Sequence, residues 1–186
     1  MYSNKSIEVY IRDLAAKLPA PGGGSAAALT ASTGAALISM VVNFTLGKPK
    51  YAKYEQELQS ILEKSESLRK RFLALVDEDV EAYKSRNMAD SLRVPHQVCD
   101  LCVEAALLCR PLLTKSNKNL ISDVAVAAIL LEAAFASAYF NVEINLRTLT
   151  DKKIVSVMRR QLLGKQKIII KLRQKTEETV GKIIRG

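Results

Sequence analysis

The stretch from Ser25 to Leu46 contains no charged residue, and it constrains the fold more than any other part of the chain. Its length would allow it to cross a bilayer as a single helix. Hydroxyl and amide side chains dilute its hydrophobicity, however, and leucine is rare in it. We therefore expect a helix buried on all sides in a soluble bundle, ended by Gly47 and Pro49.

The rest of the chain also has helical periodicity and lacks the alternation of a strand. Ile7, Ile11, Leu14 and Leu18 recur at spacings of four and three, which predicts a first helix with Ser6 as its N-cap. Further helices are predicted over residues 51–86, 95–114, 123–148 and 151–185. Since 123–148 is alanine-rich and weakly charged, we expect a second buried helix there. The sequence thus predicts an all-α, single-domain bundle of about six helices spanning residues 1–186.

The net charge of +9 is concentrated in the last predicted helix. Residues 151–186 hold 11 of the 28 basic residues and only 3 of the 19 acidic ones. The basic run consists of Lys165, Lys167, Lys171, Arg173 and Lys175. Such a run could bind nucleic acid, but neither aromatic residues nor a recognition motif accompany it. We expect a solvated face and no nucleic-acid partner.

Three cysteines lie close together in the sequence, and they bear on both compartment and metal binding. Cys99, Cys102 and Cys109 are an odd number in one segment, which does not suit a disulfide framework. Residues 1–17 also lack the pattern of a secretory signal, so a cytoplasmic protein is expected. His96 with Cys99 and Cys102 suggests zinc, but on a helix the three fan over about 120° without an evident fourth ligand. No metal site is expected.

Asp79 lies where the pattern calls for an apolar residue. The apolar seam of the 51–86 helix includes Leu68, Phe72 and Leu75, and four residues further along stands Asp79. At about 100° per residue, Asp79 lies about 20° from Phe72, whereas Asp77 faces the opposite side, where water is expected. A carboxyl group on an apolar face has a raised pKa and can transfer protons near neutral pH. The alternative is a structural ion pair or a helix cap.

A glycine run, Gly22-Gly23-Gly24, precedes Ser25 at the start of the uncharged helix. Glycines let a ligand approach the backbone, and the free N–H groups of a helix start favour an anion or a carbonyl oxygen. A simple tight turn is the alternative. The run is neither a Walker loop, because Gly-Lys-Ser/Thr does not follow, nor a dinucleotide fingerprint, because no strand precedes it.

Several motifs in one order resemble the formiminotetrahydrofolate cyclodeaminase family, which includes the C-terminal domain of bifunctional formimidoyltransferase-cyclodeaminases and stand-alone bacterial relatives similar to methenyltetrahydrofolate cyclohydrolases. The matching stretches are Pro21–Ala28, Thr45–Lys48 with Tyr51, Leu75–Tyr83, Ser116–Asp123 and Asn141–Leu146. The resemblance spans nearly the whole chain. It departs from the family at Ser116, where glycine is usual, and at residues 84–94, where the family has a longer connection.

The resemblance implies an all-helical homodimer or larger assembly that acts on a one-carbon-substituted tetrahydrofolate. The family's proposed acid/base residue matches Asp79. The implied reactions are cyclodeamination of 5-formiminotetrahydrofolate and hydrolysis of methenyltetrahydrofolate, and neither requires a metal or a redox cofactor. A non-catalytic helical dimerisation module remains the alternative.

Other polar residues are predicted to bind the substrate. The Gly22–Ser25 backbone could hold the pterin, and Asn117 and Asp123 could hydrogen bond to its edge. Asn141 and Asn145 share a helix face and could enter the cavity, or could equally form hydrogen bonds between helices in the core. The predicted contacts for the glutamate tail are Lys48 and Lys50, although exposed lysines beside a turn are usually only solvated.

Overall fold

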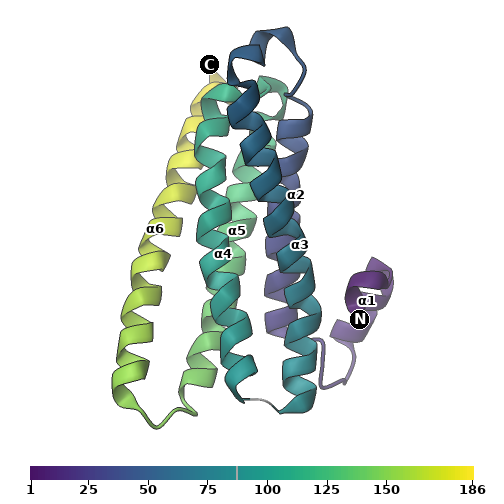
Figure 1. The fold of residues 1–186 in the computed structure, drawn as a ribbon, viewed down its shortest axis with the longest axis vertical. Helices are drawn as coiled ribbons and strands as arrows, with labels where there is room; N and C mark the ends of the chain where they lie inside the picture. The colour runs from purple at the N-terminus through teal and green to yellow at the C-terminus, as the bar shows by residue number, and fades with distance from the viewer. Residues whose placement is uncertain (87) are drawn as a thin grey trace.

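The computed structural model describes every residue except Asn87, and the described part of the chain folds as a bundle of α-helices (Figure 1). The α-helices are α1 (Ile7–Ala15), α2 (Gly23–Asn43), α3 (Glu55–Ser85), α4 (Met88–Lys115), α5 (Ile121–Leu146) and α6 (Lys152–Arg185). Short 3₁₀ helices cover Tyr2–Asn4, Pro49–Tyr54 and Lys118–Leu120. The all-α prediction with about six helices is confirmed.

Helix α2 lies at the centre of the bundle and packs against α3, α4 and α5. Its small residues allow this close approach: a Cβ atom on Gly34 would lie 2.9 Å from the Leu131 side chain of α5. Both α2 and the segment Lys118–Leu146 are long and apolar enough to span a membrane. Most of α2 is buried inside the bundle, which accounts for its apolar sequence, but the helix is not buried on all sides as predicted, because Thr33 is exposed.

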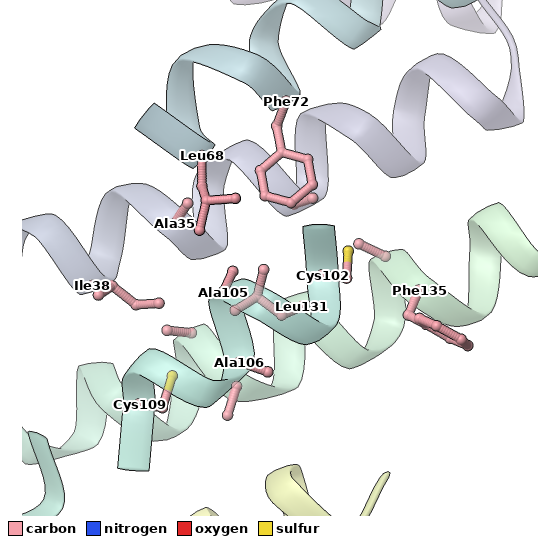
Figure 2. Close-up of a cluster of buried hydrophobic side chains, with 14 of the residues drawn as sticks. Ala35, Ile38, Leu68, Phe72, Cys102, Ala105, Ala106, Cys109, Leu131 and Phe135 are labelled. Carbon is pink, nitrogen blue, oxygen red and sulfur yellow. The ribbon is translucent and has the colours of Figure 1, made fainter. Parts of the chain in front are cut away.

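The core forms where the seams of α2, α3, α4 and α5 meet. Phe72 and Leu68 of α3 point into this space together with Ile38 of α2 and Cys102 of α4 (Figure 2). Phe72 and Cys102 are fully buried. The predicted seam of α3 is therefore confirmed, although the helix proper begins at Glu55, after the 3₁₀ turn.

Helix α4 begins earlier than predicted. It starts at Met88, so Pro95 lies inside the helix and not at its first turn. A proline lacks the N–H that would bond to the carbonyl four residues before it, which leaves the Ser91 carbonyl free. That carbonyl accepts a hydrogen bond from the Asn145 side-chain amide at 2.5 Å. The proline is tolerated because α5 supplies the missing donor.

Helix α5 is not buried on all sides, contrary to prediction. One face packs on the core, while an uncharged stripe is exposed along its whole length. The stripe consists of Ser122, Val126, Ile129, Ala133, Ser137, Phe140 and Ile144, at spacings of three and four. The low charge of α5 therefore reflects two apolar faces, of which only one is covered within this chain.

Helix α1 lies beside the bundle rather than within it (Figure 1). Ser6 caps it as predicted, since its hydroxyl accepts the Val9 N–H at 3.2 Å. The predicted apolar face is wrong, because Ile7 and Ile11 are largely exposed. The buried side chain of this helix is Tyr10.

Candidate active site

A cavity of about 280 Å³ opens at the end of the bundle where α2 begins and α5 ends. Its walls come from α2, α3, α4, α5 and the loop before α2. The lining residues are Pro19, Ala20, Gly22, Gly23, Gly24, Asp79, Ala82, Tyr83, Ser91, Asn141, Ile144 and Asn145. Several predicted site residues from distant parts of the sequence thus share one cavity.

Asp79 reaches from α3 to the start of α2. The N-cap of α2 is Gly22, which has no side chain to satisfy the free N–H groups of the first turn. The Ser25 backbone N–H instead hydrogen bonds to the Asp79 carboxylate. The Asp79 carboxylate of α3 therefore caps the N-terminus of α2, where the helix dipole favours its negative charge. Both the catalytic reading of Asp79 and the capping alternative describe this geometry.

Gly24 explains part of the glycine run. A Cβ atom at this position would lie 2.7 Å from the Asp79 Cγ, a distance that no side chain tolerates. Gly23 faces the other wall, where a Cβ would meet the Asn141 amide at 3.6 Å. The run therefore lets a helix start and a carboxylate come into contact, which a simple tight turn would not require.

Burial and hydrogen bonding act on Asp79 in opposite directions. Desolvation raises the pKa of the carboxyl group above its ordinary value, and the Ser25 N–H lowers it by a smaller amount. The net pKa is raised. Asp79 is partly exposed to the cavity, so it can exchange a proton with a ligand there.

Two asparagines of α5 line the cavity, and each donates one N–H of its side-chain amide to a backbone carbonyl. Asn145 donates to the Ser91 carbonyl, and Asn141 donates to the Ser137 carbonyl at 2.9 Å. Each side-chain oxygen is left as an acceptor. Together with Asp79, these oxygens give the cavity an acceptor-rich wall suited to a ligand edge that carries N–H groups.

Four predicted binding residues lie at the other end of the bundle. Asn117 donates its backbone N–H to the Thr45 hydroxyl at 3.0 Å, beyond the C-terminus of α2. Lys48 and Lys50 follow that end, and Asp123 lies in the first turn of α5. A helix as long as α2 spans about 30 Å, so these residues do not share the Asp79 cavity within one chain.

Several residues that line the cavity were not predicted from the sequence. Tyr83 lies one turn after Asp79, and this spacing could have identified it. Ser91 was missed because the start of α4 was placed near Pro95. Ile144 belongs to a helix that was predicted to be buried, whereas its side chain is exposed and borders the cavity.

Asp77 was also misread, since it is buried and does not face water. Its carboxylate accepts hydrogen bonds from the backbone N–H groups of Tyr2 and Ser3, the latter at 3.3 Å. The 3₁₀ helix Tyr2–Asn4 covers Asp77, which the helical phase predicted to face solvent. Asp77 therefore anchors the N-terminal segment.

The three cysteines pack in the hydrophobic core, and Lys165 of the basic run forms an ion pair. Cys99, Cys102 and Cys109 are fully buried, and burial raises the pKa of the Cys99 thiol to about 12. His96 approaches Asp100, which also pairs with Lys165 at 2.6 Å. Among the described residues, no group of three or more potential ligands is arranged to hold a metal ion.

A larger open cleft of about 830 Å³ lies between α5 and α6. Its basic lining residues are Arg147, Lys152, Arg159, Arg160 and Lys167. No carboxylate is among the residues that line it in the described chain. It offers positive charge but no carboxylate as a general base, so the Asp79 cavity is the candidate active site.

Comparison with known proteins gives one consistent family. Residues 6–89 and 85–163 match the formiminotransferase-cyclodeaminase family model. A methenyltetrahydrofolate cyclohydrolase of Methylorubrum extorquens is 35% identical, over 88% of this chain and 90% of the relative. The formimidoyltransferase-cyclodeaminase of Rattus norvegicus is 28% identical, but its alignment covers only 31% of that longer protein.

The solved structure of formiminotetrahydrofolate cyclodeaminase from Thermotoga maritima superposes with a TM-score of 0.93 at 27% identity. It covers 99% of this chain and 100% of the other. The two family-model matches meet at residues 85–89, where α3 passes into α4. The protein belongs to the formiminotransferase-cyclodeaminase family.

Proposed function

We propose that the protein is a folate one-carbon enzyme that acts on the methenyl or formimino carbon of tetrahydrofolate, with Asp79 as general acid/base. The observation that carries this proposal is the half-buried Asp79 carboxylate in a cavity at the start of α2, with its pKa raised by burial. Hydrolysis of methenyltetrahydrofolate is the primary reaction, because the relative aligned over 90% of its length is named for it. Cyclodeamination is the second candidate, since the superposed structure bears that name.

Both reactions pass through a tetrahedral carbon flanked by nitrogen atoms. In the hydrolysis, water adds to the cationic methenyl carbon while Asp79 takes one proton from that water. The protonated carboxyl group then returns the proton to the folate nitrogen as its bond to the carbon breaks. The hydroxyl group left on the carbon releases its proton to water as the formyl C=O forms, which gives formyltetrahydrofolate. In the deamination, Asp79 takes the proton from the attacking nitrogen and returns it to ammonia. One carboxyl group completes either cycle, and we propose no metal or redox cofactor.

The other cavity residues supply binding and orientation. The oxygens of Asn141 and Asn145 are acceptors for the N–H groups of the pterin edge. The free backbone N–H groups at Gly23 and Gly24 can meet a pterin carbonyl oxygen. The carboxylate of Asp79 also stabilises the cationic carbon of the methenyl group. Proximity contributes further in the deamination, because both reacting nitrogens belong to one molecule.

We also propose that the active protein is a homodimer in the cytosol. The exposed stripe of α5 is uncharged from Ser122 to Ile144 and follows helical spacing, as a helix–helix interface does. Phe140 has an exposed fraction of 75% and lies near the end of the stripe, one turn before Ile144 of the cavity. Sedimentation of wild type beside Phe140→Glu tests this: the variant should be monomeric, and an unchanged assembly would reject this interface.

The function is tested with two substrates offered separately to the purified protein. 5-Formiminotetrahydrofolate should gain the methenyl absorbance with release of ammonia, or methenyltetrahydrofolate should lose it faster than in buffer. Asp79→Asn runs beside the wild type. If wild type and buffer agree on both substrates, the proposed activity is wrong.

A further inference from the structure

We propose that Tyr10 of α1 is a positioning residue for Asp79 and acts through Ser25. The inference rests on the proposed role of Asp79. It assigns a function to residues 1–15, the N-terminal segment, none of which is among the described residues that line the cavity.

The link consists of two hydrogen bonds that share one residue. The Tyr10 hydroxyl lies 3.2 Å from the Ser25 Oγ, and Ser25 is fully buried. The backbone N–H of the same Ser25 hydrogen bonds to the Asp79 carboxylate. Ser25 therefore contacts Tyr10 through its hydroxyl group and Asp79 through its backbone N–H. A shift of Tyr10 that moves Ser25 changes the position of this N–H relative to the Asp79 carboxylate.

The same segment returns to α3 at a second point. Asp77, two residues before Asp79, accepts the N–H groups of Tyr2 and Ser3. The Tyr2 ring packs edge-on against the Tyr10 ring, with centroids 5.5 Å apart and an interplanar angle of 87°. The contacts thus close a ring that runs from Asp77 through Tyr2, Tyr10 and Ser25 to Asp79. This ring fixes the start of α2 relative to the last turns of α3.

Packing of α1 alone does not account for this arrangement. Its isoleucines, Ile7 and Ile11, are exposed by 78% and 52%, whereas Tyr10 is exposed by 4%. Tyr10 is the buried residue of the helix. A buried phenol needs a hydrogen-bond partner, and the partner here is the residue that binds the catalytic carboxylate. The helix is held to the bundle by the side chain that reaches the site.

Few other ionisable groups surround Asp79. Among the residues that line the cavity in the described chain, Tyr83 is the other titratable one, and it is largely exposed. Tyr10 lies behind Ser25, and burial raises the pKa of its phenol. Glu78 is engaged away from the cavity by Arg71 and Arg93. The charge of Asp79 also raises the pKa of the Tyr10 phenol directly. Ser25→Ala, which keeps the phenol, is therefore the variant that traces a change in the Asp79 titration to Ser25.

The test compares Tyr10→Phe with Tyr51→Phe, because both tyrosines are buried and Tyr51 lies beyond the far end of α2. The first readout needs no substrate: the Asp79 carboxyl carbon is titrated by NMR in protein labelled with ¹³C-aspartate, and Asp79→Asn identifies the signal. The second readout is the pH dependence of kcat and KM on the folate substrate. Ser25→Ala removes the hydroxyl partner while keeping the backbone N–H.

We expect the Asp79 titration to move to higher pH in Tyr10→Phe, because the Ser25 N–H that favours the carboxylate is less well held. We expect kcat of Tyr10→Phe to fall about tenfold with KM nearly unchanged. In the double variant, the loss in kcat should be smaller than the product of the Tyr10→Phe and Ser25→Ala losses, as for coupled side chains. If Tyr10→Phe does not fold, Ser25→Ala alone should show the same shift.

An Asp79 titration in Tyr10→Phe and Ser25→Ala that matches Tyr51→Phe would overturn the proposal. So would fully multiplicative losses in kcat, since independent effects do not pass through one residue. If the wild type turns over neither folate while Tyr10→Phe still shifts the Asp79 titration, the positioning role stands and the proposed function is wrong.

Discussion

Asp79 and Gly24 lie so close together that the α2 backbone and the carboxylate leave no room for a methyl group between them. A Cβ atom on Gly24 would be 2.7 Å from the Asp79 Cγ. The contact joins the N-terminus of α2 to the carboxyl group of Asp79 in the cavity. It makes the position of Asp79 depend on the glycine as much as on α3.

Gly24→Ala should therefore displace the Asp79 carboxylate. We expect folate turnover to fall at least about tenfold, since a misplacement of roughly 1 Å can cost more than that. Gly164→Ala is the matched control, because a Cβ there meets no atom within 4 Å. In the exposed helix α6 this control should stabilise the protein by about 0.5–1 kcal/mol. Equal activities for the two variants would show that the Gly24 contact has no catalytic role.

Asp79→Asn tests the acid/base role with little change in shape. The amide cannot take up a proton, so we expect kcat to fall about a hundredfold or more, while the variant stays folded. Steady-state kinetics and circular dichroism on the same preparation check both statements. An active amide variant would assign the proton transfers to another group.

The raised pKa of Asp79 also predicts how stability depends on pH. A carboxyl group whose pKa is higher in the folded state binds its proton more tightly there than in the unfolded chain. Its contribution to stability is therefore greatest below the unfolded pKa and is lost as the pH rises through the folded pKa. The Tm of Asp79→Asn minus that of wild type should increase as the pH rises from about 4 and should level off once the pH is above the folded pKa. A difference that decreases over this range would contradict the raised pKa.

Helical phase was enough to predict that Asp79 lies on the inward face of α3, because α3 is long and regular and keeps its apolar seam over many turns. The same reasoning failed for Asp77, whose solvent-facing position is covered by the N-terminal segment. Periodicity within one helix does not report which distant part of the chain will pack on it. The contact of Asp77 with Tyr2 could therefore not be predicted.

Two other errors have different physical causes. The start of α4 was placed near Pro95 because a proline normally begins a helix, and the compensating donor, Asn145, lies 50 residues further along the sequence. Lys48 and Asn117 were grouped with Asp79 because they lie in motifs of one family. The length of α2 separates them from the cavity in space, and sequence order does not contain that distance.

The buried cysteines give a prediction that is independent of activity. Burial raises the pKa of Cys99 and of Cys109 to about 12, against an ordinary value of 9.0. At neutral pH their thiolate fraction is then about a thousandfold below that of a free cysteine. Iodoacetamide should leave the native protein unmodified and should label all three thiols after unfolding in guanidinium. Rapid labelling of the native state, followed by mass spectrometry, would show that these thiols are accessible.

The last prediction concerns the proline that α5 compensates. Asn145→Leu removes the donor to the Ser91 carbonyl, which Pro95 cannot replace because it has no N–H. The loss should cost about 1 kcal/mol of stability, at the low end for an unsatisfied carbonyl because Ser91 is partly exposed. In Pro95→Ala protein the alanine N–H can bond to Ser91 within the helix, so Asn145→Leu should cost less there. Urea unfolding of wild type, Asn145→Leu, Pro95→Ala and the double variant gives this double-mutant cycle. The KM for folate should rise on Asn145→Leu both in the wild type and in Pro95→Ala, since the Asn145 oxygen is lost in both. Equal stability costs in the two backgrounds would mean that Asn145 does not compensate for the proline.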